Sequence, residues 1–285
     1  MQPELIADYQ CVCGEGPLWH PMEQRVYWVD IETGRMFRYD PKTNTHEQFF
    51  SGHTVGGFTI QADGSLLLFM DRGSVKILRD GKLETVIDAI KGEEKSRFND
   101  VIADPEGRVF CGTMPAGDQL GSLYRLDTDG SIHHILGGIG CSNGMGFTLD
   151  MKTMYYTDSE PREIYMFDYK RKSGEISNKR LFAAVSPEDG IPDGMTVDAE
   201  GYVWSARWDG NCLVRYNPKG EIVLRIEFPA KKVSSVIFGG PAYEDIYVTT
   251  AGGDNKKEEG HGAGALFRVR AGIKGRPEFF SRIGL

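Results

Sequence analysis

Short runs of apolar, β-branched and aromatic residues recur six times along the chain, with starts 39 to 48 residues apart. The runs begin at residues 26, 65, 108, 154, 202 and 246 and read VYWVD, SLLLF, RVFCG, MYYTD, YVWSA and IYVTT. Several follow a turn such as Pro-Glu-Gly or Ala-Glu-Gly, in which glycine takes a positive φ at little cost. Recurrence at this spacing predicts a repeat architecture.

Each run is flanked by further strand-like segments. One lies upstream of the turn, as at residues 58–60 and 195–197; another lies downstream, as at 122–126, and a weaker one follows, as at 132–136. No stretch shows sustained helical periodicity, which argues against alternating strands and helices. The pattern predicts an all-β, six-bladed β-propeller with four antiparallel strands per blade, formed by residues 1–285 as a single domain. An open β-sandwich would not explain six copies in register.

The two ends of the chain are expected to close the ring. Residues 4–9 read as a short strand that would pair, as the outer strand, with the blade that the C-terminal segment completes. Closure of this kind removes the exposed edges that an open sheet would leave.

Composition and charge narrow the range of partners. The chain has 285 residues, a formal net charge of -8 and no run of lysine or arginine, so we expect neither a nucleic-acid nor a membrane partner. The first ten residues lack the features of a signal peptide, and the five cysteines lack paired spacing. We therefore expect reduced thiols and a cytoplasmic protein. Nothing in the sequence indicates an obligate protein partner.

Four of the six repeats carry an oxygen-bearing side chain at the start of the predicted inner strand, namely Glu15, Asn99, Asn143 and Asp193. A radial repeat brings equivalent positions to one mouth of the central channel, where the loops predicted at residues 113–121, 158–162, 207–211 and 251–264 would form the walls. Each of these side chains could simply cap a turn. Turn capping, however, does not require that all four occupy the same position in their blades, so the shared position favours a common site. Oxygen ligands suit a hard divalent cation, whose charge would offset that of the two carboxylates.

Six short motifs, in order along essentially the whole chain, resemble the SMP-30/gluconolactonase/luciferin-regenerating-enzyme family. They are GEGPLW (14–19), RFNDV (97–101), SNGM (142–145), IPDGM (191–195), DAEG (198–201) and FGG (238–240). The resemblance implies a six-bladed propeller, one catalytic divalent cation in the channel mouth, and hydrolysis of a sugar lactone to the aldonic acid.

The resemblance also implies roles for particular residues. Glu15, Asn143 and Asp193 correspond to the metal ligands, and Asp193 is in addition the proton-transfer group. Arg97 and Asn99 correspond to residues of the substrate pocket, with Asn99 close to the metal or its water. The cation would polarise the lactone carbonyl and activate water. Ca²⁺ is the ion expected in a structure, and Zn²⁺, Mn²⁺, Mg²⁺ or Fe²⁺ are alternatives.

Other functions remain open on the sequence alone. A metal-dependent esterase or phosphotriesterase of the paraoxonase type would use a similar oxygen-ligated cation, and a calcium-binding propeller or interaction platform would need no catalysis. The histidines lack metal-ligand spacing, and no serine lies in a nucleophile-elbow motif. Trp208, on a predicted mouth loop, could stack on a sugar ring or simply pack in the loop. The glycine-rich segment 252–264 reads as a solvated loop.

Overall fold

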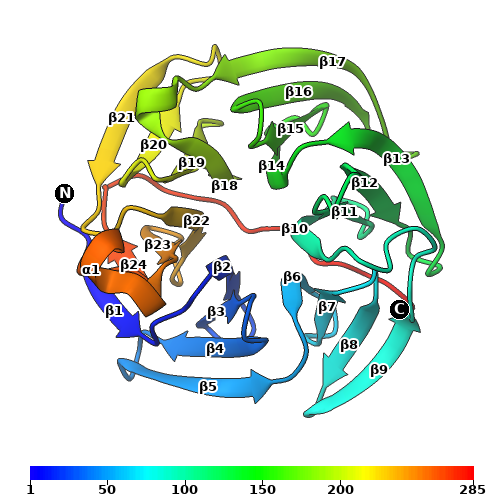
Figure 1. Ribbon diagram of the computed structural model, residues 1–285, viewed down its shortest axis with the longest axis horizontal. Coiled ribbons are helices and arrows are strands. Elements are labelled where there is room, and N and C mark those ends of the chain that lie inside the picture. The colour runs from blue at the N-terminus through cyan, green and yellow to red at the C-terminus, as the bar shows by residue number, and fades with distance from the viewer.

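Six four-stranded antiparallel sheets are arranged as blades around a central channel in the computed structural model, which describes residues 1–285 (Figure 1). The prediction of a six-bladed β-propeller is therefore confirmed. In blades 1 to 5 the chain runs from the inner strand at the channel to the outer strand at the rim. None of the helices has the length and apolar character needed to span a bilayer.

The first three blades take up the N-terminal half of the chain. Blade 1 consists of β2 (Gly14–His20), β3 (Arg25–Asp30), β4 (Arg35–Asp40) and β5 (Thr45–Ser51). Blade 2 consists of β6 (Val55–Ile60), β7 (Leu66–Met70), β8 (Val75–Arg79) and β9 (Lys82–Ile87). Blade 3 consists of β10 (Phe98–Ala103), β11 (Val109–Thr113), β12 (Gly121–Leu126) and β13 (Ile132–Ile139).

The remaining blades include all three helical turns. Blade 4 consists of β14 (Ser142–Phe147), β15 (Thr153–Asp158), β16 (Glu163–Lys170) and β17 (Glu175–Ala184). Blade 5 follows the 3₁₀ turn η1 (Pro187–Asp189) and consists of β18 (Ile191–Val197), β19 (Val203–Trp208), β20 (Cys212–Tyr216) and β21 (Ile222–Glu227). Blade 6 consists of β22 (Val233–Gly239), β23 (Asp245–Thr250), β24 (Ala265–Val269) and β1 (Glu4–Asp8), with η2 (Gly253–Asn255) and α1 (Lys256–Glu259) between β23 and β24.

The first strand closes the ring as predicted. β1 pairs antiparallel with β24, placing Glu4 opposite Arg268, and the two side chains form an ion pair at 2.8 Å. On the inner side of the same junction, the Ser234 hydroxyl donates to the carbonyl of Gly14 at 2.5 Å and so links β22 to β2. The last blade is therefore joined to the first at both its outer and its inner edge.

The apolar core lies between neighbouring blades rather than in one central mass. Trp28 of blade 1 and Tyr247 of blade 6 belong to one buried cluster, and Trp204 of blade 5 and Phe238 of blade 6 belong to another. Burial of such aromatic side chains against the adjacent sheet is the main source of cohesion around the ring. The channel itself can therefore be lined by side chains that serve another purpose.

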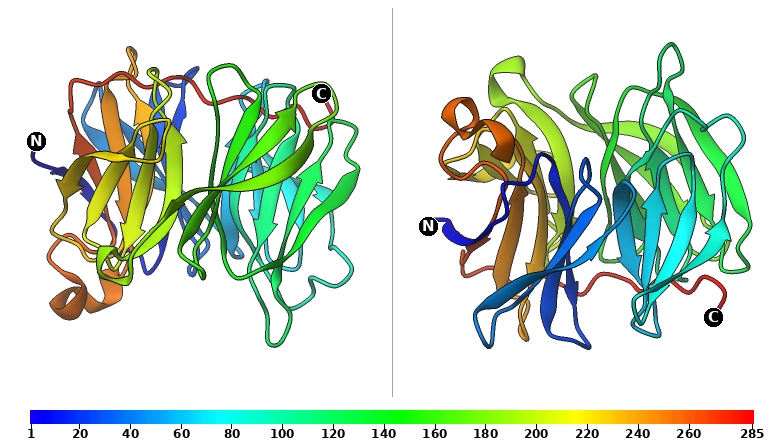
Figure 2. Two further views of the ribbon diagram at one scale, coloured as in Figure 1. Left: turned by 90° about the horizontal axis from the view of Figure 1, so that it is seen from above. Right: turned by 60° about the horizontal axis from the view of Figure 1, so that its bottom comes forward.

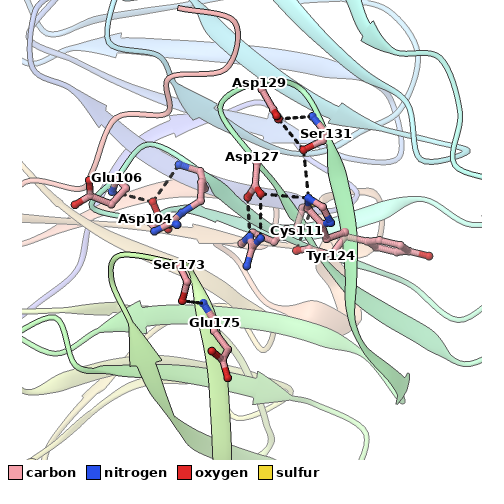
Figure 3. Close-up of polar contacts among 12 residues, drawn as sticks. Asp104, Glu106, Cys111, Tyr124, Asp127, Asp129, Ser131, Ser173 and Glu175 are labelled. Atoms are coloured by element: carbon pink, nitrogen blue, oxygen red, sulfur yellow. Dashed lines mark hydrogen bonds and ion pairs between the residues drawn. The ribbon is translucent and has the colours of Figure 1, made fainter.

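Aspartates shape the polar turns between strands, as expected for the Asp-Pro-Glu-Gly and Asp-Thr-Asp-Gly sequences. The Asp104 carboxylate accepts the backbone N–H groups of Glu106 and Arg108, and Asp129 accepts both the N–H and the hydroxyl of Ser131 (Figure 3). Asp104 also pairs with the Arg108 guanidinium at 2.6 Å. These local bonds fix the turn conformation in which the chain reverses direction between consecutive antiparallel strands.

The segment after β24 crosses one end of the channel. Residues 270–285 run over this face of the ring, whereas α1 projects from the opposite face (Figure 2). The crossing is anchored to several blades: Gly275 donates its N–H to the carbonyl of Tyr243 at 2.7 Å, and Arg282 donates its N–H to that of Gly107 at 2.8 Å. The Ser281 hydroxyl accepts from Thr59 at 2.8 Å. We refer to residues 270–285 as the C-terminal strap.

The prediction of a solvated loop at residues 252–264 is wrong for both ends of that segment, which are buried. Its centre forms η2 and α1, and Glu259 at the end of α1 binds the Lys232 ammonium at 2.5 Å. Gly264 lies so close to the backbone of Cys11 that a Cβ atom would approach the Cys11 carbonyl oxygen to 2.6 Å. Close packing against the first residues of the chain replaces the expected solvation.

Candidate active site

Every inner strand changes register at its start. The pairing with the second strand of the blade shifts between Glu15 and Leu18 in β2, and the same shift occurs in β6, β10, β14, β18 and β22. A bulge of this kind interrupts the alternation of side chains and redirects them. The four residues predicted to share a register all lie in these bulges, and all are buried: Glu15, Asn99, Asn143 and Asp193 are 4%, 8%, 5% and 6% exposed.

Hydrogen bonds join three of the predicted residues directly. The Arg97 guanidinium donates to Asn99 Oδ1 at 2.7 Å, and Asn99 Nδ2 donates to Asn143 Oδ1 at 3.0 Å. Asn143 Nδ2 in turn donates to Ser159 Oγ at 2.8 Å, and this hydroxyl donates to the carbonyl of Pro192 at 2.6 Å. The bonds run in one direction from blade 3 through blade 4 to the residue before Asp193 in blade 5.

The two predicted carboxylates lie close enough to affect each other's ionisation. Burial raises the pKa of Glu15 well above its usual value, and the charges of Asp193 and Asp100 raise it further. Burial followed by the charge of Asp100 raises the pKa of Asp193 in the same way. The N–H of Gly16 donates to Glu15 Oε2 at 2.8 Å and partly opposes the shift. The site therefore concentrates acidic groups in surroundings that disfavour their negative charge.

Asp100 is a member of this acidic group that the sequence reasoning missed. Burial raises its pKa to about 7, and the positive charge of Arg97 opposes the rise. In the other blades the residue after the shared register position is a serine, Ser235, or one of four glycines: Gly16, Gly57, Gly144 and Gly194. Asp100 is thus the one charged residue of the ring at this register, and that exception was visible in the sequence.

The glycines allow the inner strands to approach one another at the site. A Cβ atom at Gly144 would lie 2.6 Å from the backbone oxygen of Asp193, and one at Gly194 would lie 2.1 Å from Ser235 Oγ. Side chains at these positions would force the strands apart. The close approach brings the residues that precede the glycines, Asn143 and Asp193, to adjacent strands at the same height in the channel.

Two arginines supply positive charge. Arg97 is half-buried and faces Glu32 of the β3–β4 turn, with 3.8 Å between guanidinium and carboxylate. Arg207 at the end of β19 is 1% exposed, forms no ion pair with a carboxylate, and is held by Ser205 Oγ and the Tyr216 hydroxyl, each at 2.5 Å. Its positive charge partly opposes the rise in the pKa of Asp193 that burial and Asp100 cause. The sequence placed residue 207 on a mouth loop but gave no sign of its burial beside the acidic group.

The donor set fits a divalent cation with oxygen ligands. Glu15 and Asp193 offer carboxylates from blades 1 and 5, and Asn143 offers an amide oxygen from blade 4. No group of three or more His, Cys, Asp or Glu side chains is placed to hold a metal ion, so any such site here depends on the amide. Burial raises the pKa of the nearby Cys141 thiol to about 12, which keeps this sulfur neutral. Buried acids that raise each other's pKa are stabilised by a cation between them.

A cavity of about 70 Å³ occupies the channel on the inner side of the site. Asp100 lines it from β10, whereas Glu278, Phe279 and Phe280 line it from the C-terminal strap. The Thr196 hydroxyl donates to Glu278 at 2.9 Å, and burial raises the pKa of Glu278. The strap thus forms the floor of the channel at the end away from Glu15 and Asn143.

Trp208 follows Arg207 at the end of β19 and is half-buried. The Lys232 ammonium lies over its ring, 5.5 Å from the centroid. This contact accounts for the position of the indole without a bound sugar, so its stacking role stays a prediction.

Comparison with known proteins identifies the family. Residues 13–252 match the model of the SMP-30/Gluconolactonase/LRE-like region, and the chain belongs to this family. The predicted resemblance is therefore confirmed.

Three relatives show how far the likeness extends. Pentonolactonase XacC of Haloferax volcanii is 48% identical over 287 residues, covering 98% of both chains. The solved structure of a luciferin-regenerating enzyme has a TM-score of 0.90 and 29% identity, and the match covers 99% of each chain. A calcium-binding regucalcin from Agrobacterium tumefaciens has a TM-score of 0.89 at 23% identity, over 98% of this chain and 97% of that one, which shows a shared fold. The 48% identity over nearly the full length supports a lactone-hydrolysing enzyme.

Proposed function

We propose that this protein hydrolyses a sugar lactone, with an aldonolactone of a pentose as the first substrate to test. The pentonolactonase from Haloferax volcanii supports this choice, because the likeness to it extends over 98% of both chains. The observation that carries the proposal is the convergence of buried Glu15, Asn143 and Asp193 from three blades at one register of the channel.

Glu15, Asn143 and Asp193 would hold one divalent cation, with Ca²⁺ as the first candidate because all three donors are oxygens. When bound, the cation supplies Lewis acidity that polarises a lactone carbonyl and lowers the pKa of water. The Asn143 amide oxygen accepts one hydrogen bond, from Asn99, and a carbonyl oxygen has a second lone pair to offer.

The remaining side chains would position the substrate and move the proton. Arg97 would donate to the lactone hydroxyls or to the developing negative charge on the carbonyl oxygen. Asn99, fixed by Arg97 and Asn143, would hold substrate or water beside them. Asp193 would take the proton from the attacking water and pass it to the ring oxygen as the ester bond breaks.

A substrate panel tests the proposal. The purified chain is assayed with pentono- and hexonolactones, an aryl ester and an organophosphate, each after chelation and after restoring Ca²⁺, Mn²⁺, Mg²⁺ or Zn²⁺. We expect lactone hydrolysis that disappears with chelator and returns with metal. Faster turnover of the ester or organophosphate than of every lactone would favour a paraoxonase-like esterase, and no turnover of any substrate would leave a binding protein.

A further inference from the structure

Ser159 follows the last residue of β15, and its hydroxyl links the two strands that carry Asn143 and Asp193. It is 5% exposed, and its hydroxyl forms one hydrogen bond within blade 4 and one to blade 5. The hydroxyl oxygen accepts a hydrogen bond from Asn143 Nδ2 at 2.8 Å, and the hydroxyl group donates one to the carbonyl of Pro192 at 2.6 Å. None of the family motifs in the sequence includes this serine.

These two bonds determine which way the Asn143 amide faces. Because the Ser159 proton is committed to Pro192, the serine can offer Asn143 only an acceptor, so the NH₂ group of the amide must face Ser159. The carbonyl oxygen Oδ1 then faces Asn99, whose Nδ2 donates to it at 3.0 Å. The reverse orientation would place two NH₂ groups against each other and would leave the Pro192 carbonyl without its donor.

We propose that Ser159 is a positioning residue that holds the Asn143 carbonyl oxygen toward the channel, in the orientation that a divalent cation requires. The inference rests on the proposed function in one respect, since it concerns the cation site formed with Glu15 and Asp193. An amide with free rotation would present either a carbonyl oxygen or an NH₂ group, and only the oxygen can ligate a cation.

Titration of the metal-free full-length chain with CaCl₂, and separately with MnCl₂, measures the effect by calorimetry. We expect Ser159→Ala to weaken cation affinity by about 10- to 100-fold, the usual consequence of losing a partner that orients a ligand. Thr157→Val is the matched control. Thr157 is fully buried two residues earlier in the same blade, and its hydroxyl has no hydrogen-bond partner, so this variant should bind within about twofold of the unmodified chain.

A second pair of variants, built on Asn143→Asp, distinguishes loss of the side-chain orientation at position 143 from a general loss of order in the site. In Asn143→Asp, both side-chain atoms are oxygens, so rotation of the group no longer changes what it presents. Adding Ser159→Ala to Asn143→Asp should therefore change cation affinity by less than about threefold. An equal loss in both backgrounds would overturn the positioning role, as would wild-type affinity in Ser159→Ala alone.

The outcomes also distinguish this inference from the function on which it rests. If the unmodified chain binds neither cation, the proposed cation site fails and the role of Ser159 fails with it. If the unmodified chain binds and hydrolyses as proposed but Ser159→Ala binds equally well, only the role of Ser159 is overturned. Thermal unfolding of the metal-free variants checks that each is folded before titration.

Discussion

At the scale of single residues, Asn99 and Asp100 show how the site gathers more polar groups than strand alternation allows. In a regular strand, neighbours point to opposite faces, and the residue after a site residue would face away from it. The bulge between Phe98 and Val101 removes this constraint, so that Asn99 bonds to Asn143 while Asp100 lines the channel cavity and raises the pKa of Glu15. The shared register was readable in the sequence, but the bulge was not, and Asp100 was missed for that reason.

Replacement of Asp193 by alanine tests its proposed double role as ligand and proton acceptor. We expect Asp193→Ala to lower kcat for lactone hydrolysis by at least about 10²- to 10⁴-fold, the range that a positioned acid–base group contributes, and to weaken cation binding as well. Steady-state kinetics and calorimetry on the same sample measure both effects. Near-wild-type turnover would remove Asp193 from the mechanism.

The pKa of Asp100 predicts how stability depends on pH without metal. Its pKa is about 7 in the folded chain and about 3.9 when unfolded. Between these values the folded state holds the proton more tightly, so this group makes the free energy of unfolding fall as the pH rises from about 4 to 7 and level off above. Urea unfolding with chelator at pH 5.5 and pH 8 should show a smaller loss for Asp100→Asn than for the unmodified chain. Identical losses would contradict the assignment.

At the scale of elements, the position of the inner strands depends on the glycines that follow the site residues. Gly144 and Gly194 leave no room for a Cβ atom between β14, β18 and β22. The sequence motifs contain these glycines, yet a motif alone does not say whether glycine is needed for a turn or for close approach. The structure shows that close approach is the reason at Gly144, whose φ is not positive.

Gly144→Ala should therefore destabilise the protein through overpacking. The new Cβ atom would lie 2.6 Å from the Asp193 carbonyl oxygen, and we expect a loss of about 1–3 kcal/mol in the free energy of unfolding, with a matching fall in cation affinity. Gly137→Ala in the outer strand β13 is the control, because its Cβ would meet only the His134 side chain, at 3.3 Å. Denaturant unfolding of both variants measures the difference, and equal stability would show that β14 and β18 can separate freely.

Other elements differ in how well the sequence indicated them. The strands, their antiparallel order and the closure by β1 follow from periodicity and turn residues, which are local signals. The helical turn α1 does not, since Lys256–Glu259 is too short for a periodic pattern and is held by its contact with Lys232. Ser159 was missed because its partners, Asn143 and the Pro192 carbonyl, lie 16 and 33 residues away in the sequence. Arg207 was missed because its local bonds to Ser205 and Tyr216 do not indicate burial beside the acidic group.

At the scale of the whole molecule, a cation held by blades 1, 4 and 5 would act as a cross-link within the ring. It would bind the folded chain and not the unfolded one, because the three proposed ligands are more than 40 residues apart in sequence. Binding energy of this kind adds to the free energy of unfolding.

Calcium should consequently raise the thermal stability of the intact protein. At a free concentration near 100 times the dissociation constant, the expected gain is about 2.7 kcal/mol, which corresponds to a shift of several degrees in Tm. Scanning calorimetry with chelator and with CaCl₂ measures the shift, and Asp193→Ala should show none. A Tm that does not respond to calcium in the unmodified chain would argue against calcium as the resident ion.

The C-terminal strap covers one end of the channel, which leaves the opposite end as the expected entrance for substrate. Glu278, Phe279 and Phe280 line the far end of the channel, so we expect a lactone to enter from the opposite face and the acid formed from it to leave by the same route. Product and substrate then cannot occupy the channel entrance at the same time. The acid should therefore inhibit competitively with respect to the lactone. The acid departs as an anion from a protein of net charge -8, and this mutual repulsion favours its escape.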